Sequence, residues 1–276
     1  MHILLPIISA ILAGPWSEKQ SNTAIEQSNT AIGQANDSIY RAWTNNAWQK
    51  GENLKYRVHY GLVNAGEIEM KVEPQMATIG GRQVFHINAH GRSLSGFDWF
   101  FRVRDHYQSY IDAKAIQPLQ FVKYMEEGTY RDSDFALFNY KVKKVSSARK
   151  GVVSFTGDVQ DLVSAIYYAR TLNVKNAKPG DLFPLQVYMD GVVYDLQIRY
   201  VGREVINTDI GKINAIKVVP MVVADRVFKE QEGLLLWVSD DENKVPLRVK
   251  AELLVGSVKA DIISHSNLKH PLNMAK

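Results

Sequence analysis

From Glu52 onward the sequence alternates between apolar and polar residues with a period of two. In KYRVHYG the residues Tyr56, Val58 and Tyr60 share one side, and polar residues occupy the other. The segment GEIEMKVE repeats this pattern. Because successive side chains of a strand point to opposite faces, the alternation predicts half-buried β-strands.

The same alternation of apolar and polar residues continues through most of the chain. Further strands are expected in VFHINAHG, FRVRDHYQSYID, LQFVKYMEEG and FALFNYKVKK. A second series is expected in FPLQVYMDG, VVYDLQIRYVG, REVINTDIG, KINAIKVVPMV, GLLLWVSDD and VPLRVKAELLVGSVKADII. Glycine- and proline-containing turn signals separate these segments, which favours antiparallel pairing.

One helix is expected between the two series, from Gly157 to Asn173, with Asp158 as its N-cap. Its apolar stripe is formed by Leu162, Ala165, Ile166 and Ala169, widened by Tyr167, Tyr168 and Arg170. The predicted fold is therefore mainly β, with curled antiparallel sheets or a barrel-like closure and one central amphipathic helix.

Residues 1–14, MHILLPIISAILAG, form an apolar run that is shorter than the roughly 20 residues of a membrane span. Its length suits a signal-peptide core, although no Lys or Arg precedes it, and a buried N-terminal helix is the alternative. Pro15 stands where a lipoprotein would carry its acylated cysteine. We expect a signal peptide at 1–14 and export to the periplasm.

Residues 15–48 contain three copies of a seven-residue repeat, QSNTAIE, QSNTAIG and QANDSIY. Each repeat has one apolar heptad position, whereas a coiled coil needs two. We therefore expect a spacer, with a partner-binding or oligomerisation arm as the alternative. A single β domain at 50–265 and a C-terminal tail at 266–276 complete the expected organisation.

Composition limits the chemistry. The 276 residues are 46% apolar, enough for a substantial core, and 33 Lys and Arg against 29 Asp and Glu leave a net charge of only +4. That balance does not indicate nucleic-acid binding. The absence of cysteine excludes disulfides, thiolate nucleophiles and Cys-zinc sites. No cofactor is expected.

Several short motifs of the expected β domain occur together. They are Tyr56, Tyr60, Gly61, Ala65 and Gly66; Val103 to Asp112; Pro118, Gly128 and Tyr130; Asp161 to Arg170; and Leu236 to Leu247. In combination they resemble the bacterial exported family called domain of unknown function 3108, over about residues 50–265. The resemblance implies a cell-envelope protein with a leader and a curled β architecture. It implies no reaction, cofactor or catalytic residue.

The residues give little support for catalysis. His86 and His90 share a strand face but would lie about 13 Å apart, too far for one metal ion without a histidine from a neighbouring strand. We assign no metal ligand and no catalytic residue. A hydrolase of an envelope polymer or lipid that depends on Asp105 or Asp161 is kept as an alternative.

The remaining feature is aromatic. Alternation in SGFDWFF places Phe97, Trp99 and Phe101 on one strand face and Phe100 on the other. The first face is interpreted as core, with the lining of a ligand site as the alternative. The candidate ligand-binding residues are Phe97, Trp99, Phe101, Arg104, Asp105, Tyr107 and Tyr110. We expect a non-catalytic binding module for an apolar, lipid-like ligand or a cell-envelope partner, at most peripheral to a membrane. A structural assembly protein is the further alternative.

Overall fold

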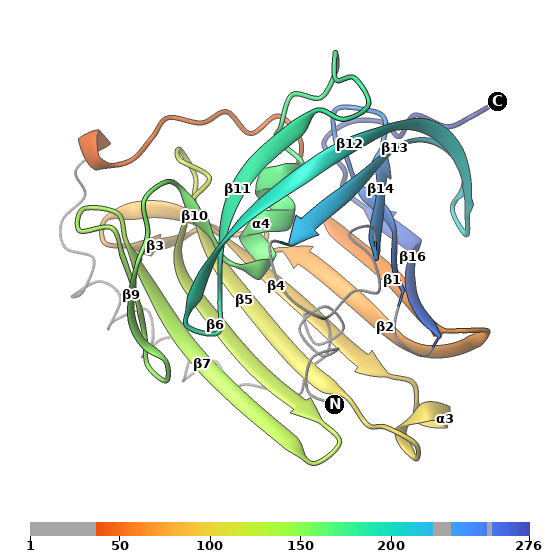
Figure 1. The fold of residues 1–276 in the computed structure, drawn as a ribbon, viewed down its shortest axis with the longest axis horizontal. Helices are drawn as coiled ribbons and strands as arrows, with labels where there is room; N and C mark the ends of the chain where they lie inside the picture. Colours follow the sequence, from red (N-terminus) through yellow and green to blue (C-terminus); the bar gives the residue numbers. More distant parts are fainter. Residues whose placement is uncertain (1–36, 223–232, 253–255) are drawn as a thin grey trace.

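The computed structural model describes residues 37–222, 233–252 and 256–276. The expected signal peptide and the repeat as far as residue 36 lie outside the described residues. A single curled sheet of sixteen strands forms the body of the described chain (Figure 1). The prediction of a mainly β, antiparallel architecture is confirmed.

The strands of the first half of the chain all belong to this sheet. They are β1 (Asn53–Tyr60), β2 (Val63–Val72), β3 (Ala77–Ile79), β4 (Arg82–Ser93), β5 (Arg104–Asp112), β6 (Pro118–Glu127), β7 (Tyr130–Asn139), β8 (Lys144–Ser147) and β9 (Gly151–Ser154). The second half continues the same sheet. Its strands are β10 (Val159–Gln160), β11 (Leu182–Met189), β12 (Val192–Thr208), β13 (Gly211–Val222), β14 (Leu234–Ser239), β15 (Pro246–Glu252) and β16 (Ser257–Ser266).

The strand order runs β10-β11-β12-β13-β14-β15-β16-β1-β2-β4-β5-β6-β7-β8-β9, with β3 paired to β4. Neighbouring strands are antiparallel except for the parallel pair β10 and β11. The first and last strands of the chain, β1 and β16, pair with each other and so join the two halves. Within the described residues no ladder connects β9 to β10, so the sheet curls without closing into a barrel.

The expected alternation places apolar side chains on the concave side. In β1, Leu54, Tyr56 and Val58 are buried, whereas Arg57 lies on the outer face in an ion pair with Glu67, 2.9 Å away. Cross-strand charge pairs of this kind complete the polar face of a half-buried sheet. The pattern read from the sequence therefore fixes which face of β1 is covered.

The two ends of the curled sheet approach each other. Tyr188 of β11 meets the edge of Phe138 of β7, with ring centroids 5.8 Å apart. The ammonium of Lys123 on β6 pairs with Asp132 at 2.8 Å and also with Asp190 in the β11–β12 turn. These contacts hold the sheet curled although no ladder closes it.

The helical expectation is met only in part. Helix α4 (Leu162–Ala169) lies inside the curl and contacts β5, β10 and β11 (Figure 1). A second, four-residue helix, α3 (Ser95–Asp98), connects β4 to β5, and a 3₁₀ turn, η2 (Asp37–Ile39), precedes β1. The expectation of a single helix is therefore too simple.

Two details of α4 differ from the sequence prediction. The N-cap is Asp161, not Asp158, because Asp161 accepts hydrogen bonds from the backbone of Val163 and Ser164 while the Ser164 hydroxyl accepts from the Asp161 backbone. Asp158 instead pairs with Arg41 at 3.1 Å. Of the expected stripe, Tyr167 and Tyr168 are buried, together with Val163 and Ser164, whereas Ile166 is exposed.

The segment before β1 packs on the domain. Trp48 is buried, donates from Nε1 to the carbonyl of Tyr167 at 3.0 Å and meets the edge of Phe85. Near the other terminus, Met274 forms an isolated bridge with Ile213 of β13. Residues on both sides of the expected β domain thus contribute to its packing.

Candidate functional site

Large apolar side chains are exposed at one end of the sheet. Because neighbouring strands are antiparallel, the β1–β2 turn, the β4–β5 connection and the β6–β7 turn emerge at the same end (Figure 1). We call the apolar residues of these three connections the aromatic tip. They are Tyr60, Leu62, Val63, Phe97, Trp99, Phe100, Phe101 and Tyr130.

The centre of the aromatic tip is the β4–β5 connection. Trp99 is 84% exposed and Phe100 is 66% exposed, so the expectation that this segment is core is wrong. The reason is local: Phe97 and Asp98 both donate backbone N–H groups to the carbonyl of Leu94, and this helical turn replaces the expected strand. A period of two therefore does not describe residues 95–101, and Trp99 and Phe100 point into solvent.

An ion pair anchors the connection to the sheet. Arg104, the first residue of β5, donates from Nη1 to Asp98 Oδ1 at 3.1 Å and to the Ser93 hydroxyl at 3.0 Å. The hydrogen bonds from Arg104 lower the pKa of the Asp98 carboxyl. The Ser93 hydroxyl in turn accepts from the Val103 backbone at 2.8 Å. Polar groups beneath the exposed rings thus hold the base of the connection in place.

The β4–β5 connection also contacts its neighbours. Leu94 donates its backbone N–H to Ala65 of β2 at 2.9 Å. On the other side, Gly128 donates to the carbonyl of Arg102 at 2.7 Å, and a Cβ atom at Gly128 would lie 3.1 Å from the Phe101 ring. The three connections therefore form one continuous surface.

Arginines border the aromatic tip. Arg92, Arg102 and Arg131 are each at least half exposed. Arg92 pairs with Glu67 at 2.9 Å, and Arg131 pairs with Glu126 at 2.8 Å. Exposed pairs of this kind are worth at most about 1 kcal/mol, so these arginines can exchange their carboxylate partners for other anions at little cost.

The other candidate residues lie elsewhere. Asp105 and Tyr107 are buried on the concave face of β5; Asp105 Oδ1 accepts from the Glu126 backbone at 2.8 Å, and Tyr107 lies beside Phe121. Tyr110 lies on the opposite face of β5, stacked on His86 with ring centroids 4.3 Å apart. The structure therefore places Phe97, Trp99 and Phe101 in one connection, which Arg104 anchors through Asp98, but it does not bring Asp105, Tyr107 or Tyr110 to them.

The two carboxylates of the hydrolase alternative are inaccessible to solvent in this structure. Asp161 is fully buried, and its Oδ2 accepts from the Ser109 hydroxyl at 2.6 Å. Burial raises the pKa of Asp161 to about 6, against the opposing effect of its hydrogen bonds. Asp105 is also fully buried. Both carboxylates serve structural hydrogen bonds, and neither is exposed to solvent.

Sequence reasoning missed the partners of the exposed rings. Leu62 is fully exposed at the β1–β2 turn, and Val63 and Tyr130 are also exposed. The only sequence signal is an apolar pair, LeuVal, beside the turn glycine Gly61. That signal gains meaning only when the strand order is known, because the three connections are far apart in the chain.

Comparison with known proteins places the chain in a family. Residues 55–263 match the family described as protein of unknown function, DUF3108. The chain belongs to the DUF3108 family. The resemblance read from the motifs of this DUF3108 protein is thereby confirmed. No curated protein matches its sequence.

Solved structures resemble the fold of this DUF3108 protein. A β-barrel-like protein of the domain of unknown function DUF1849 from Brucella abortus is 7% identical, with a TM-score of 0.54, covering 80% of this chain and 99% of that one. This likeness shows the fold alone. A Bacteroides fragilis protein described as exported, with a YmcC-like fold, is 12% identical at a TM-score of 0.34, covering 82% of this chain and 100% of that one.

A third similar structure is a protein of Parabacteroides distasonis described as a lipoprotein. It is 10% identical at a TM-score of 0.31, and the comparison covers 82% of this DUF3108 chain and 100% of that chain. Among the described residues of the present chain, every helix is too short or too polar to cross a membrane. Of the three similar structures, one is described as exported and one as a lipoprotein, and none of the three descriptions states a ligand.

Proposed function

We propose that this DUF3108 protein is a non-catalytic exported module that docks on a lipid surface through the aromatic tip. The observation that carries the proposal is the exposure of Trp99, Phe100 and Leu62 on neighbouring connections of one rigid sheet. Exposed apolar residues are common singly, but a contiguous group of large ones marks an interaction surface.

The shape of the aromatic tip favours a lipid surface over a protein groove. The β1–β2 turn, α3 and the β6–β7 turn lie beyond the ends of the strands (Figure 1). Their exposed side chains, such as Trp99 and Phe100, can therefore enter an interface without moving the sheet. Aromatic residues are enriched at the boundary between lipid headgroups and acyl chains. Each large side chain that leaves water contributes on the order of 2 kcal/mol, so several together give useful affinity.

The arginines provide the second part of the interaction. Arg92, Arg102 and Arg131 flank the rings at the level where headgroup phosphates would lie. A basic residue near an anionic membrane contributes about 1 kcal/mol. The expected target is therefore a membrane surface with anionic phospholipids, bound by rings that enter the interface and by arginines that pair with phosphates.

The anchor explains how the rings could stay exposed without collapsing onto the sheet. Arg104 and Asp98 fix the end of α3, and the missing side chain of Gly128 leaves room for the Phe101 ring, which a Cβ atom there would approach to 3.1 Å. The pre-ordered connection would lose little conformational entropy on docking. In this proposal Phe97, Trp99 and Phe101 contact lipid or support the contact, and Arg104 positions them.

Co-sedimentation with vesicles tests the proposal. The protein is mixed with vesicles of phosphatidylcholine alone or of phosphatidylcholine with phosphatidylglycerol. We expect the double variant Trp99→Ser/Phe100→Ser to bind at least tenfold more weakly than the wild type. The matched control is Val152→Ser/Val205→Ser, which removes exposed apolar side chains from β9 and β12. Residues 1–36 are the same in every protein, so the comparison isolates the aromatic tip.

A second comparison tests the arginines. The triple variant Arg92→Gln/Arg102→Gln/Arg131→Gln should lose affinity for the anionic vesicles and much of its dependence on salt, while binding to phosphatidylcholine stays the same. Equal vesicle binding by the Trp99→Ser/Phe100→Ser variant and its valine control would overturn the proposal. The proposal would also be overturned if the aromatic tip bound a soluble envelope protein and did not bind vesicles.

A further inference from the structure

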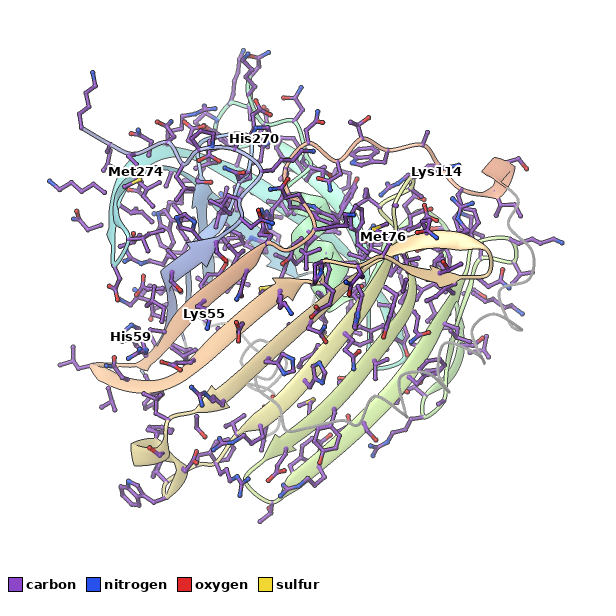
Figure 2. All side chains as sticks on the ribbon, turned by 180° about the vertical axis from the view of Figure 1, so that it is seen from behind. Lys55, His59, Met76, Lys114, His270 and Met274 are labelled. Atoms are coloured by element: carbon purple, nitrogen blue, oxygen red, sulfur yellow. The ribbon has the colours of Figure 1, made fainter. Side chains whose placement is uncertain are left out.

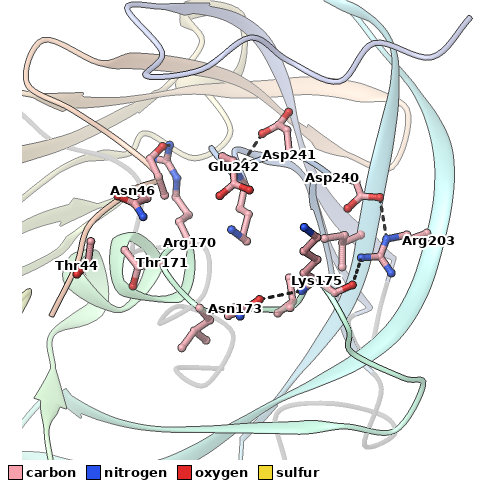
Figure 3. A pocket seen from close by; sticks show the side chains of 15 residues that line it. Thr44, Asn46, Arg170, Thr171, Asn173, Lys175, Arg203, Asp240, Asp241 and Glu242 are labelled. Atoms are coloured by element: carbon pink, nitrogen blue, oxygen red, sulfur yellow. Dashed lines mark hydrogen bonds and ion pairs between the residues drawn. The ribbon is translucent and has the colours of Figure 1, made fainter.

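A pocket lies at the opposite end of the domain from the aromatic tip. It has a volume of about 460 Å³ and opens between the segment before β1, the residues after α4 and the β14–β15 turn (Figure 3). Pockets of roughly 300–1,000 Å³ hold small-molecule ligands in other proteins. Its wall combines amide and hydroxyl groups with charged side chains, and Leu172, Val174 and Ile216 supply apolar surface.

Most of the charges in this pocket already have partners. Arg170 is paired with the carboxylate of Glu52 at 2.6 and 2.7 Å. Asp240 accepts from Arg203 at 2.8 Å, a contact drawn in Figure 3. Asp241 accepts backbone N–H groups from Asn243 at 2.9 Å and from Asn273 at 3.0 Å. These groups build the wall, so they are not free to meet a ligand's charge.

Three charged residues remain. Among the described residues, no ion pair engages Lys175, Glu242 or Lys244. Lys244 is held with a positive φ of 45° by the same turn whose Asp241 carboxylate accepts its backbone N–H. Burial lowers the pKa of the Lys244 ammonium, which indicates that water solvates this cation poorly. The pocket charges without an ion pair among the described residues are therefore the ammonium groups of Lys175 and Lys244 and the carboxylates of Glu242 and Asp241. Of these two carboxylates, that of Asp241 is already occupied by backbone N–H groups.

The walls of the pocket are pre-ordered. The guanidinium of Arg170 donates to the carbonyl of Asn243 at 2.9 Å and so ties the end of α4 to the β14–β15 turn. The amide of Asn243 donates to the carbonyl of His270 at 2.9 Å, and the His270 backbone donates back to Asn243 Oδ1 at 2.8 Å. Lys244, the next residue, is therefore presented by a turn that is fixed on two sides.

We propose that this pocket binds a small polar molecule with one carboxylate or phosphate group. Lys244 and Lys175 pair with the anionic group, and Glu242 accepts a hydrogen bond from a hydroxyl or ammonium group of the same ligand. Leu172, Val174 and Ile216 cover its carbon skeleton. Binding of an anion satisfies a partly desolvated ammonium that has no ion-pair partner among the described residues, which is where the affinity comes from.

The pocket is independent of the aromatic tip. Glu52, which pairs with Arg170 in the pocket wall, precedes the first residue of β1, and Tyr60 at the aromatic tip is the last. A strand of that length spans about 26 Å. In Figure 2 His59 lies beside the β1–β2 turn, whereas His270, next to the pocket, lies at the other end of the domain. One protein can therefore hold a small ligand and a membrane surface at the same time.

Isothermal titration calorimetry at constant ionic strength tests the proposal with four probes: inorganic phosphate, glutamate, glucose 6-phosphate and glucose. We expect saturable binding of at least one anionic probe and none of glucose. Tighter binding of phosphate and glucose 6-phosphate than of glutamate would indicate a phosphate site, and the reverse order would indicate a carboxylate site. Lys244→Gln should weaken the binding at least tenfold, and Lys175→Gln should weaken it as well.

Lys143→Gln is the matched control, because Lys143 also has a positive φ, 53°, but lies in the β7–β8 turn outside the pocket. It should bind the probe as the wild type does. Absence of saturable binding of all three anions, or unchanged affinity in a folded Lys244→Gln variant, would overturn the proposal. Vesicle binding should be the same in Lys244→Gln and wild type. A negative result for the pocket is therefore distinct from a negative result for membrane docking.

Discussion

Arg170 and Glu52 form a two-point ion pair, with Nη1–Oε1 and Nη2–Oε2 distances of 2.6 and 2.7 Å and side-chain exposures of 2% and 0%. The pair joins the residue before β1 to the end of α4. Two charges this deeply buried are tolerable only because each satisfies the other and Arg170 also donates to Asn243. Through the ion pair and this hydrogen bond, Arg170 links the start of β1, the end of α4 and the β14–β15 turn.

Breaking this pair on one side should be strongly destabilising. We predict that Arg170→Met lowers the free energy of unfolding by about 3–5 kcal/mol, because Glu52 is left charged and buried. Urea unfolding followed by circular dichroism measures the change. The double variant Arg170→Met/Glu52→Gln should recover part of the loss, since no uncompensated charge remains. A double variant less stable than Arg170→Met would contradict this explanation.

The capping carboxylate of Asp161 should make stability depend on pH. Its pKa of about 6 in the folded protein lies above the ordinary value of 3.8, so the folded state binds the proton more tightly. The stabilisation is complete below pH 3.8 and is lost as the pH rises through about 6. From that difference the loss is on the order of 3 kcal/mol.

The variant Asp161→Asn tests this prediction. Asparagine is a good N-cap, its oxygen can accept from Val163 and Ser164, and its amide can donate to the Ser109 hydroxyl. We expect it to be at least as stable as the wild type at pH 7 and to lack the wild type's loss of stability between pH 4 and 7. Parallel stability curves for the two proteins would show that Asp161 does not titrate in this range.

Lys123 should hold the sheet curled. Its side chain is only 4% exposed, and although burial opposes its charge, hydrogen bonds to Asp132 and Asp190 raise the pKa of its ammonium. Lys123→Met should cost about 2 kcal/mol, because the buried Asp132 loses one of its two cationic partners and keeps only Arg149. Hydrogen exchange should also become faster in the β11–β12 turn. Asp190→Asn should cost less stability, because the Asp190 side chain is about half exposed. A loss of stability in Asp190→Asn equal to that in Lys123→Met would contradict the role assigned to Lys123.

How well the sequence predicts the fold depends on how far apart in the chain the interacting residues are. The alternation of Tyr56, Val58 and Tyr60 is local, and it correctly identifies β1 and its buried side. The pairing of β1 with β16 depends on residues more than 190 positions apart, as in Val58 with Ala260, and no local pattern encodes it. The sequence accordingly predicts either curled sheets or a barrel-like closure, and only the strand order shows that the sheet is open.

The two main local errors have a common physical cause. In α4 the predicted stripe correctly includes Tyr167 and Tyr168, which the curl buries, but it also includes Ile166, which is exposed, and it omits the buried Val163 and Ser164. In the β4–β5 connection, apolar residues at every second position suggested a strand, but no neighbouring element covers Trp99. In both places tertiary packing, which periodicity does not report, decides which side chains are buried.

The aromatic tip should respond to a methyl group placed beneath it. Gly128 and Gly61 have nearly the same φ, 58° and 57°, but a Cβ atom at Gly128 would lie 3.1 Å from Phe101, whereas one at Gly61 meets nothing within 4 Å. Both alanine variants carry the same backbone strain, about 1 kcal/mol. Gly128→Ala should additionally displace Phe101 and weaken binding to anionic vesicles several-fold. Gly61→Ala, with equal strain and no contact, should bind nearly as the wild type does, so equal losses in the two variants would show that the position of Phe101 is unimportant for docking.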